Sequence, residues 1–304
     1  MDWITGIQNA INYIEDHITE ELDYEEIEQK SYSSPFHFQR IFSILCGYTL
    51  GEYIRNRRLS LAAEELSTGN EKVIDVAAKY GYESPDSFTR AFQKFHGMTP
   101  SQARGNGAVL KSFSRLHLKI SLEGGTMMNY KIEQKPEMLL LGYKRRYEGT
   151  PHGEARIKQE EEMYVTTRAH QWILQGMSSS KGINYVVLKN PDRDGYDFCI
   201  AYAIDLWTRD NLYNEQITGI DFMDRFGFEE IRIPACTYAV FETQRQRYPI
   251  EEYGELLQKI YTEWLPSSDC RLADAPEIAV YHWGTIRQDP NRTIEIWIPI
   301  EEKK

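Results

Sequence analysis

Apolar residues recur at helical spacing through the first hundred residues of the chain. Two short patterns are each followed, after a polar turn, by a longer one that begins with Ser-Pro and ends at Gly47 or Gly97. Serine caps a helix, proline fits its first turn and glycine ends it. The predicted helices span residues 24–30, 35–46, 73–79 and 85–96, with a connecting helix over residues 50–66. This arrangement predicts two helix-turn-helix units.

The two units are related by an internal repeat. A shift of 50 positions places residues 32–49 over residues 82–99, and eight of the 18 aligned residues are identical. Chance alone gives about one identity. The connecting helix of about 17 residues spans roughly 25 Å, which with its flanking turns separates the units by about one turn of DNA. One chain can therefore read two successive major grooves.

The second helix of each unit is the candidate DNA reader, because this helix enters the major groove in helix-turn-helix proteins. Arginine reads guanine and glutamine reads adenine, so Gln39, Arg40 and Arg90 are the candidates for base contacts. The alternative is an all-helical interaction module whose arginines are solvated or cap carbonyls. The side chains predicted to face DNA are Phe36, His37, Gln39, Arg40 and Ser43 in the first unit and Asp86, Ser87, Thr89, Arg90 and Lys94 in the second.

The same region resembles the signature of AraC/XylS-type transcription regulators. The residues that carry the resemblance are Arg58-Leu59, Ala62, Ile74-Asp75-Val76-Ala77, Gly81-Tyr82, Ser87-Phe88, Arg90-Ala91-Phe92, Gly97, Thr99-Pro100 and Arg104. The resemblance covers residues 5–105 and implies a seven-helix DNA-binding domain with two reading helices. It implies double-stranded DNA as a partner, and RNA polymerase as a further one. Asp86 departs from this chemistry, because phosphate repels a carboxylate unless it accepts from a cytosine amine.

Charge limits the kind of DNA binding that this region can perform. The whole chain has a net charge of −11 at pH 7. Residues 1–105 contain ten Lys and Arg against sixteen Asp and Glu, a balance of −6. Because neutralisation of phosphate by basic side chains dominates non-specific affinity, we expect weak non-specific binding and a large share of specific contacts.

A different pattern begins after residue 105. Residues 106–128 are predicted to form a linker with one strand, in which Leu116, Leu118, Ile120 and Leu122 alternate with polar residues. The next strands are predicted at residues 130–134, 138–147, 185–189, 198–206, 229–233, 237–243, 278–283 and 293–300, and helices at residues 155–175 and 250–264. The predicted fold is therefore multidomain. An all-α double helix-turn-helix domain (1–105) precedes an α+β domain of two strand-strand-helix-strand-strand copies (129–304).

The α+β region resembles the GyrI-like small-molecule-binding domain, the effector module of multidrug-responsive regulators. The resemblance rests on Ile233-Pro234, residues 238–241, residues 260–266, Tyr281 and residues 295–300. A two-reader domain followed by this module is the Rob-type arrangement. The resemblance implies a transcription regulator controlled by a small amphipathic, often cationic, effector in a cleft between the two copies.

Aromatic and acidic residues on two neighbouring predicted strands form the candidate effector site, since a cation among aromatic rings is stabilised by the rings and by a counter-charge. Alternation along each strand places these residues on shared faces. The family has glutamate two residues before the tyrosine, where this chain has Ala279, so either Glu277 or Glu295 supplies the charge. Trp172, Trp207 and Trp264 are expected to be core anchors. The candidate effector-binding residues are Glu277, Tyr281, Trp283, Glu295 and Trp297.

Sequence motifs for catalysis and metal binding are absent. The chain has no G-x-S-x-G, H-E-x-x-H or P-loop, and its seven histidines lack metal-ligand spacing. The four cysteines lie far apart and are expected to be free thiols. We therefore expect a cytoplasmic protein with no membrane segment, no metal, no cofactor and no enzymatic activity. The alternative is a GyrI-like hydrolase or a protein that sequesters a toxic small molecule, because a carboxylate in an aromatic cleft suits both roles.

Overall fold

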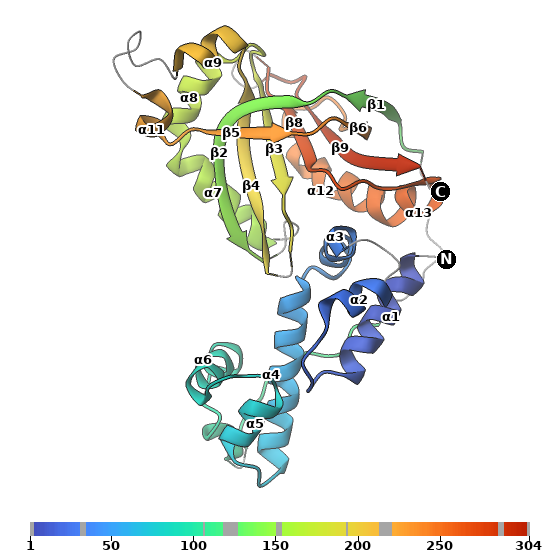
Figure 1. The fold of residues 1–304 in the computed structure, drawn as a ribbon, viewed down its shortest axis with the longest axis vertical. Helices are drawn as coiled ribbons and strands as arrows, with labels where there is room; N and C mark the ends of the chain where they lie inside the picture. The colour runs from blue at the N-terminus through green and yellow to red at the C-terminus, as the bar shows by residue number, and fades with distance from the viewer. Residues whose placement is uncertain are drawn as a thin grey trace. The chain divides into compact units, whose positions relative to one another are not determined.

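The computed structural model describes residues 3–30, 35–105, 107–117, 127–149, 154–192, 194–212, 221–284 and 289–302 of the chain. The protein divides into two compact units, a helical one formed mainly from residues 1–121 and a sheet-containing one formed mainly from the residues that follow (Figure 1). Among the described helices, none is long and apolar enough to cross a membrane.

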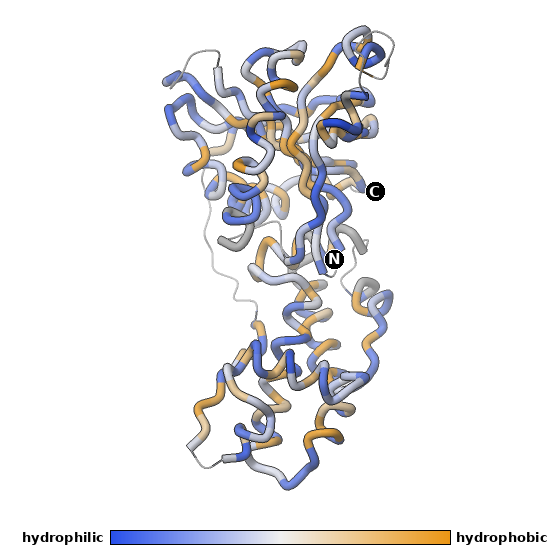
Figure 2. The backbone as a smooth tube through the Cα atoms, turned by 90° about the vertical axis from the view of Figure 1, so that its left-hand side faces the viewer, coloured by the Kyte–Doolittle hydropathy of each residue, from blue (hydrophilic) through white to orange (hydrophobic). Residues whose placement is uncertain are grey.

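The described part of the first unit is helical. Its elements are α1 (Trp3–Asp16), α2 (Tyr24–Lys30), α3 (Pro35–Cys46), α4 (Leu50–Thr68), α5 (Val73–Lys79), α6 (Pro85–His96) and the 3-10 turn η1 (Gln102–Arg104). The five helices predicted from the apolar pattern are confirmed. At the start of α6, Ser84 accepts a hydrogen bond from the N–H of Ser87, and Gly97 ends the helix with a φ of +79°. In Figure 2 hydrophobic and hydrophilic residues alternate along these helices, as expected for helices that bury one face.

Equivalent phenylalanines hold the second helix of each unit in place. Phe38 and Phe42 in α3, like Phe88 and Phe92 in α6, are at most 1% exposed. The ring centroids are 5.7 Å apart in the first pair and 5.5 Å apart in the second. These positions match in the sequence repeat. The repeat therefore preserves the apolar contact that fixes which face of each helix points outward.

Residues 108–117, which we call the strap, pack back onto the helical unit. The N–H of Phe113 donates to Ser60 Oγ at 2.6 Å, and its carbonyl accepts from Arg57 at 2.6 Å. The Phe113 ring lies 5.1 Å from the ring of Tyr48. Of the predicted strand, the structure describes residues 115–117, which are not in a strand, and the N–H of Leu116 donates to Tyr53 of α4 instead. The rest of that predicted strand, residues 118–122, lies outside the described residues.

One large antiparallel sheet forms the centre of the second unit. Its strands are β1 (Tyr130–Lys135), β2 (Met138–Glu148), β3 (Ile183–Lys189), β4 (Gly195–Ala203), β5 (Glu229–Ile233), β6 (Cys236–Glu242), β7 (Cys270–Leu272), β8 (Glu277–His282) and β9 (Thr293–Glu302). They pair in the order β1-β6-β9-β8-β3-β4-β2-β5, and β7 adds to β9. The strand predicted to reach Leu206 ends at Ala203 instead. Asp205 accepts a hydrogen bond from the N–H of Thr208 at 2.9 Å and so starts a helix there.

Two predicted long helices are interrupted. The described helical elements are α7 (Glu154–Thr166), α8 (Arg168–Met177), α9 (Leu206–Leu212), α11 (Phe222–Phe226), α12 (Ile250–Lys259), the π-helix η2 (Ile260–Trp264) and α13 (Leu265–Ser267). The helix predicted over residues 155–175 breaks at Thr167. The hydroxyls of Thr166 and Thr167 donate to carbonyls of the preceding turn, at 2.8 and 2.7 Å, and this bonding bends helices. The second predicted helix continues past Lys259 as a π-helix.

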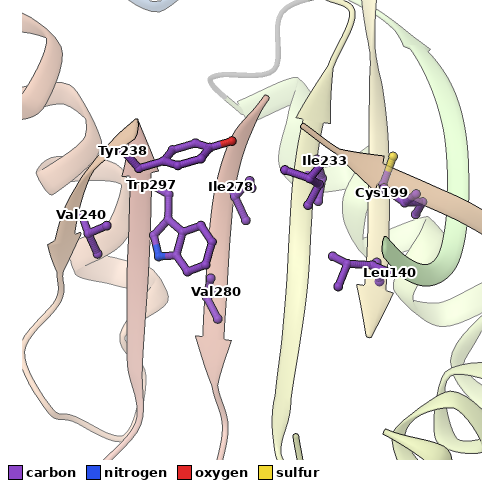
Figure 3. Packing of buried hydrophobic residues seen from close by; sticks show 11 residues of the cluster. Leu140, Cys199, Ile233, Tyr238, Val240, Ile278, Val280 and Trp297 are labelled. Carbon is purple, nitrogen blue, oxygen red and sulfur yellow. The ribbon is translucent and has the colours of Figure 1, made fainter. Parts of the chain in front are cut away.

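The two faces of the sheet have different partners. On one face, Tyr147 of β2 donates to the carbonyl of Gln159 in α7 at 2.9 Å, and Tyr281 of β8 lies 6.4 Å from Tyr253 of α12. We call this the helix face. The opposite face, which we call the cluster face, carries a continuous apolar cluster that includes Trp297 (Figure 3).

Candidate DNA-binding and effector sites

Helix α6 presents a line of exposed polar side chains. Asp86, Arg90 and Lys94 are exposed and follow one another at a spacing of four residues, and Thr89 is half-buried beside them. Ser87 differs from the others, because its hydroxyl donates to the carbonyl of Ser84 at 2.8 Å and is part of the helix cap. The second predicted reader therefore has its two basic residues on one outward stripe.

Helix α3 is described less fully. The side chains of Phe36, His37 and Arg40 lie outside the described residues. Gln39 is half-buried. Ser43, which is also predicted to face DNA, is 4% exposed. The contact of Ser43 with DNA stays a prediction.

Arginines on the connecting helix α4 fix the helical scaffold rather than face a groove. Arg57 binds the carboxylate of Glu15 through two nitrogens, at 2.8 and 2.7 Å. Arg58 donates to the carbonyls of Ile18 and Glu20 at 2.8 and 2.7 Å. Burial alone raises the pKa of Glu15, but the bonds from Arg57 and from a tyrosine outweigh it and hold the pKa below its usual value. These contacts tie α1 and the following turn to α4.

The sheet register separates the five predicted effector residues. Ile278 pairs with Trp297, and Val280 pairs with Glu295, so these four side chains share the cluster face. Residues Glu277, Ala279 and Tyr281 alternate with them and therefore lie on the helix face. The prediction that one ligand touches Tyr281, Trp283 and Trp297, with Glu277 or Glu295 as counter-charge, is wrong, because Trp297 points to the opposite side of the sheet from Tyr281.

Most of the predicted residues are already engaged. Glu277 is 2% exposed and accepts a hydrogen bond from the Tyr261 hydroxyl at 2.8 Å. Glu295 accepts from the indole of Trp297 at 2.7 Å and lies 3.3 Å from His282. The contact with His282, opposed by burial and helped by Trp297, lowers the pKa of Glu295. The ammonium of Lys135 lies 4.3 Å from the Trp297 ring centroid, so a side chain of the protein occupies this cation site.

A pocket of about 430 Å³ opens on the helix face beside α8. Trp283 is the predicted residue that reaches it, and the Tyr281 ring stacks on Trp283 with a centroid distance of 5.2 Å. Trp172 is 63% exposed, so its predicted core role is wrong; Trp207 is exposed too, whereas Trp264 is buried as expected. This pocket is the candidate effector site, and we call it the effector pocket. Its described lining residues are Tyr164, Val165, Arg168, Gln171, Trp172, Gln175, Ile183, Asn184, Tyr202 and Trp283.

The effector pocket has the features of a small-molecule site. Exposed Trp172 and Val165 form part of its wall, and exposed large apolar side chains that gather in one place mark binding surfaces. Trp283 follows β8, whereas the other described lining residues come from α7, α8, β3 and β4. A ligand here touches both halves of the second unit. Within the described parts of the chain, no cluster of three His, Cys, Asp or Glu residues is suited to a metal ion.

Known protein families match both units. A helix-turn-helix domain matches residues 29–106, and the GyrI-like small molecule binding domain matches residues 128–301, more than half of the chain. The transcriptional activator AarP of Providencia stuartii is 42% identical over 98 residues, which cover 32% of this chain and 73% of AarP. The regulatory protein SoxS of Salmonella typhimurium is 42% identical over 98 residues, covering 32% of this chain and 92% of SoxS. A putative transcription regulation protein from Staphylococcus aureus MU50 has a solved structure that covers 58% of this chain and 99% of its own, with a TM-score of 0.39 and 18% identity.

A repeated helix-turn-helix unit joined to a small-molecule-binding domain defines a DNA-binding transcription regulator. More specifically, the chain belongs to the AraC-type regulators and carries a GyrI-like domain after its DNA-binding region. The relatives matched by its helical unit are transcription regulators.

Proposed function

We propose that the protein binds an asymmetric duplex site through α3 and α6 in two successive major grooves, and that a small amphipathic compound in the effector pocket controls this binding. The exposed basic side chains of Arg90 and Lys94 on α6 carry the proposal, and the sequence repeat places Arg40 at the position equivalent to Arg90 in a second helix. Double-stranded DNA is the first partner, and RNA polymerase is the further partner of a regulator that activates transcription.

Two arginine substitutions test the DNA-binding part. Arg90→Ala should weaken binding to a selected duplex by about 1–3 kcal/mol and relax the preference at one base position. Arg40→Ala should do the same at a second position, because Arg40 and Arg90 are equivalent in the repeat. Fluorescence anisotropy with duplexes selected from a random library measures both effects. Arg232→Ala, an exposed arginine on β5, is the matched control. Unchanged binding by both α3 and α6 variants would contradict the proposal.

A tryptophan substitution tests the effector part. A thermal-shift screen of amphipathic compounds should find ligands, since a bound ligand stabilises the fold by mass action. Trp172→Ala should remove the shift, because it deletes an exposed wall of the pocket. Trp207→Ala is the control, as Trp207 is also exposed but is not among the described lining residues. Equal loss in both variants, or in neither, would argue against this pocket.

We infer that the second unit consists of two copies of one strand-strand-helix-strand-strand unit that exchange their first strands. The sheet order supports this, because β1 pairs with β6 of the second copy and β5 pairs with β2 of the first. The order reads the same from either end when the copies are interchanged. Aligning Pro136 of the first copy with Pro234 of the second places Leu140 at the position of Tyr238. Following the strand pairings from there, Ala201 corresponds to Trp297 and Tyr185 to Ile278. Asn184 therefore corresponds to Glu277.

The hydrolase alternative needs a general acid or base beside the bound compound. The described residues that line the effector pocket include no carboxylate, histidine or cysteine. The two acidic candidates, Glu277 and Glu295, are engaged elsewhere. These observations favour a receptor, and conversion of a bound compound by the purified protein would be the result that favours an enzyme.

A further inference from the structure

Asn184 in β3 is the buried polar residue of the effector pocket. Its side chain is 3% exposed and lines the pocket from the helix face. The indole N–H of Trp283 donates to Asn184 Oδ1 at 2.5 Å. An indole nitrogen can only donate, so the atom that it meets must be the amide oxygen. Trp283 therefore fixes which way the amide of Asn184 points.

This orientation assigns a donor to the pocket. Among the described residues, Nδ2 of Asn184 has no hydrogen-bond acceptor. Native proteins rarely leave a buried amide donor unmatched. The amide can be matched by a ligand atom that accepts a hydrogen bond, and a cationic nitrogen cannot fill that role.

The charges near the pocket favour a negatively charged acceptor. Arg168 is the charged residue among the described lining residues, and its guanidinium lies 5.9 Å from the ring centroid of Trp172. Glu295 lies on the cluster face of the sheet. Asn184 pairs with Tyr281, and Glu277 is four residues further along that strand, a separation of about 13 Å at 3.3 Å per residue. Neither Glu277 nor Glu295 is therefore placed to repel an anion bound at Asn184.

The comparison between the two copies agrees with this assignment. The position of Asn184 in the first copy corresponds to Glu277 in the second. Glu277 accepts a hydrogen bond from Tyr261, whereas Asn184 lines the effector pocket with a buried amide nitrogen that no described residue accepts from. In the second copy, Glu277, the carboxylate suited to a cation, is therefore buried and hydrogen-bonded. In the first copy, which contains the effector pocket, the equivalent residue is Asn184, a neutral donor.

We propose that the effector pocket selects flat aromatic compounds that bear a carboxylate. The ring lies against Trp172 and Trp283, and the carboxylate accepts a hydrogen bond from Asn184 and pairs with Arg168. This inference rests on the proposed role of the pocket as the effector site. It replaces the cationic preference expected from the sequence with an anionic one.

Three probes with the same rings separate charge from shape. They are naphthalene-2-carboxylate, naphthalene-2-carboxamide and 2-naphthylmethylammonium. Calorimetric titration of the full chain should rank the carboxylate tightest and the ammonium weakest, with a difference of about tenfold or more. Arg168→Gln should weaken the carboxylate about tenfold and leave the carboxamide unchanged. Arg232→Gln, at an exposed arginine on β5, is the matched control and should change neither affinity.

Asn184→Asp tests the amide directly. It keeps the acceptor for Trp283 and the side-chain shape but replaces the NH2 group by oxygen. The carboxylate should lose about tenfold or more in affinity, whereas the carboxamide, which can turn its own NH2 group toward the new carboxylate, should lose less. Thermal melting shows whether this variant folds. If it does not fold, Arg168→Gln still tests the preference for an anion, because Arg168 is exposed.

The outcomes distinguish this inference from the proposed function. Tighter binding of the ammonium probe than of the carboxylate, lost in Trp172→Ala, overturns the inference and leaves the pocket as the effector site. Binding of none of the probes, or binding that Trp172→Ala does not change, overturns the inference together with the assignment of this pocket. The inference is supported if the carboxylate binds most tightly and the ammonium most weakly. Arg168→Gln and Asn184→Asp must also weaken the probes as predicted.

Discussion

His96 in α6 is held between two backbone groups of the helical unit. The N–H of Lys111 donates to Nδ1 at 3.2 Å, so Nδ1 carries no proton, and Nε2 donates to the carbonyl of Leu59 at 3.1 Å. Burial lowers the pKa of His96, the bond to Leu59 opposes this shift and the charge of Lys111 adds to it. The neutral tautomer is the form that satisfies both partners.

Acidification should therefore destabilise the helical unit through His96. Because its pKa is lower in the folded chain, the unfolded chain binds more protons as the pH falls below the ordinary value of 6.5. This contribution to stability is complete above that value and decreases below it, by up to about 1.4 kcal/mol per pH unit. Urea unfolding one pH unit above and one pH unit below 6.5, followed by the circular dichroism of the helices, measures this change in the free energy of unfolding. His96→Gln should show a smaller pH dependence, and an equal one would contradict the assignment.

The effector residues show what alternation along a strand can predict. It correctly places Glu277 and Tyr281 on one face of their strand and Glu295 and Trp297 on one face of the next. Whether residues of the two strands lie on the same side of the sheet depends on the pairing register. A shift of the register by one residue would move one strand's set to the opposite side. Register is a tertiary property that one strand does not encode. Trp172 was equally beyond reach, because an exposed aromatic on an amphipathic helix has the same spacing as a buried one.

Among the elements, the strap has the largest consequence for the domain boundary. The sequence places the end of the DNA-binding domain at residue 105, yet residues 108–117 bond to both halves of the helical unit. Lys111 bonds to His96 in α6, and the N–H of Leu116 bonds to Tyr53 in α4 at 3.3 Å. Leu110 packs against the core around α6. We propose that the folding unit extends to residue 117.

A fragment of residues 1–117 should be more stable than residues 1–105. Loss of the strap removes the packing of Leu110 and Phe113 and leaves Arg57 and Ser60 without these partners, at a cost of about 2 kcal/mol or more. Thermal melting compares the two fragments, and anisotropy tests whether both still bind the selected duplex. Phe113→Ala in the longer fragment should give an intermediate melting temperature. Equal melting temperatures would place the boundary at residue 105.

Helices of the first unit were predicted more closely than those of the second for a local reason. The ends of α6 are set by a serine cap and a glycine within the segment itself. By contrast, the break at Thr167 depends on how two hydroxyls bond the preceding turn, and the π-helix η2 places Tyr261 against Glu277 in β8. Both depend on contacts that periodicity does not contain.

For the whole molecule, charge restrains how DNA is held. Residues 1–105 carry ten basic side chains. Four of them have partners within the helical unit: Lys30 with Glu26, Arg57 with Glu15, Arg58 with two carbonyls and Lys79 with Glu65. At most six are left for phosphate or base contacts, against a surrounding net charge of −6. This balance favours recognition by specific contacts over general attraction to DNA.

A salt titration should show this restraint. Each neutralised phosphate contributes about −0.9 to the slope of log affinity against log salt, so six cations give a slope no steeper than about −5. Random duplexes should bind weakly at physiological salt, whereas the selected duplex keeps its advantage because base contacts release few counterions. Fluorescence anisotropy on both duplexes across a salt series measures the two slopes. If Lys94 binds phosphate, Lys94→Ala should make the slope on the selected duplex shallower. If Arg90 reads a base, Arg90→Ala should change that slope less. Tight, steeply salt-dependent binding to random duplexes would mean that basic residues beyond residue 105 also contact DNA.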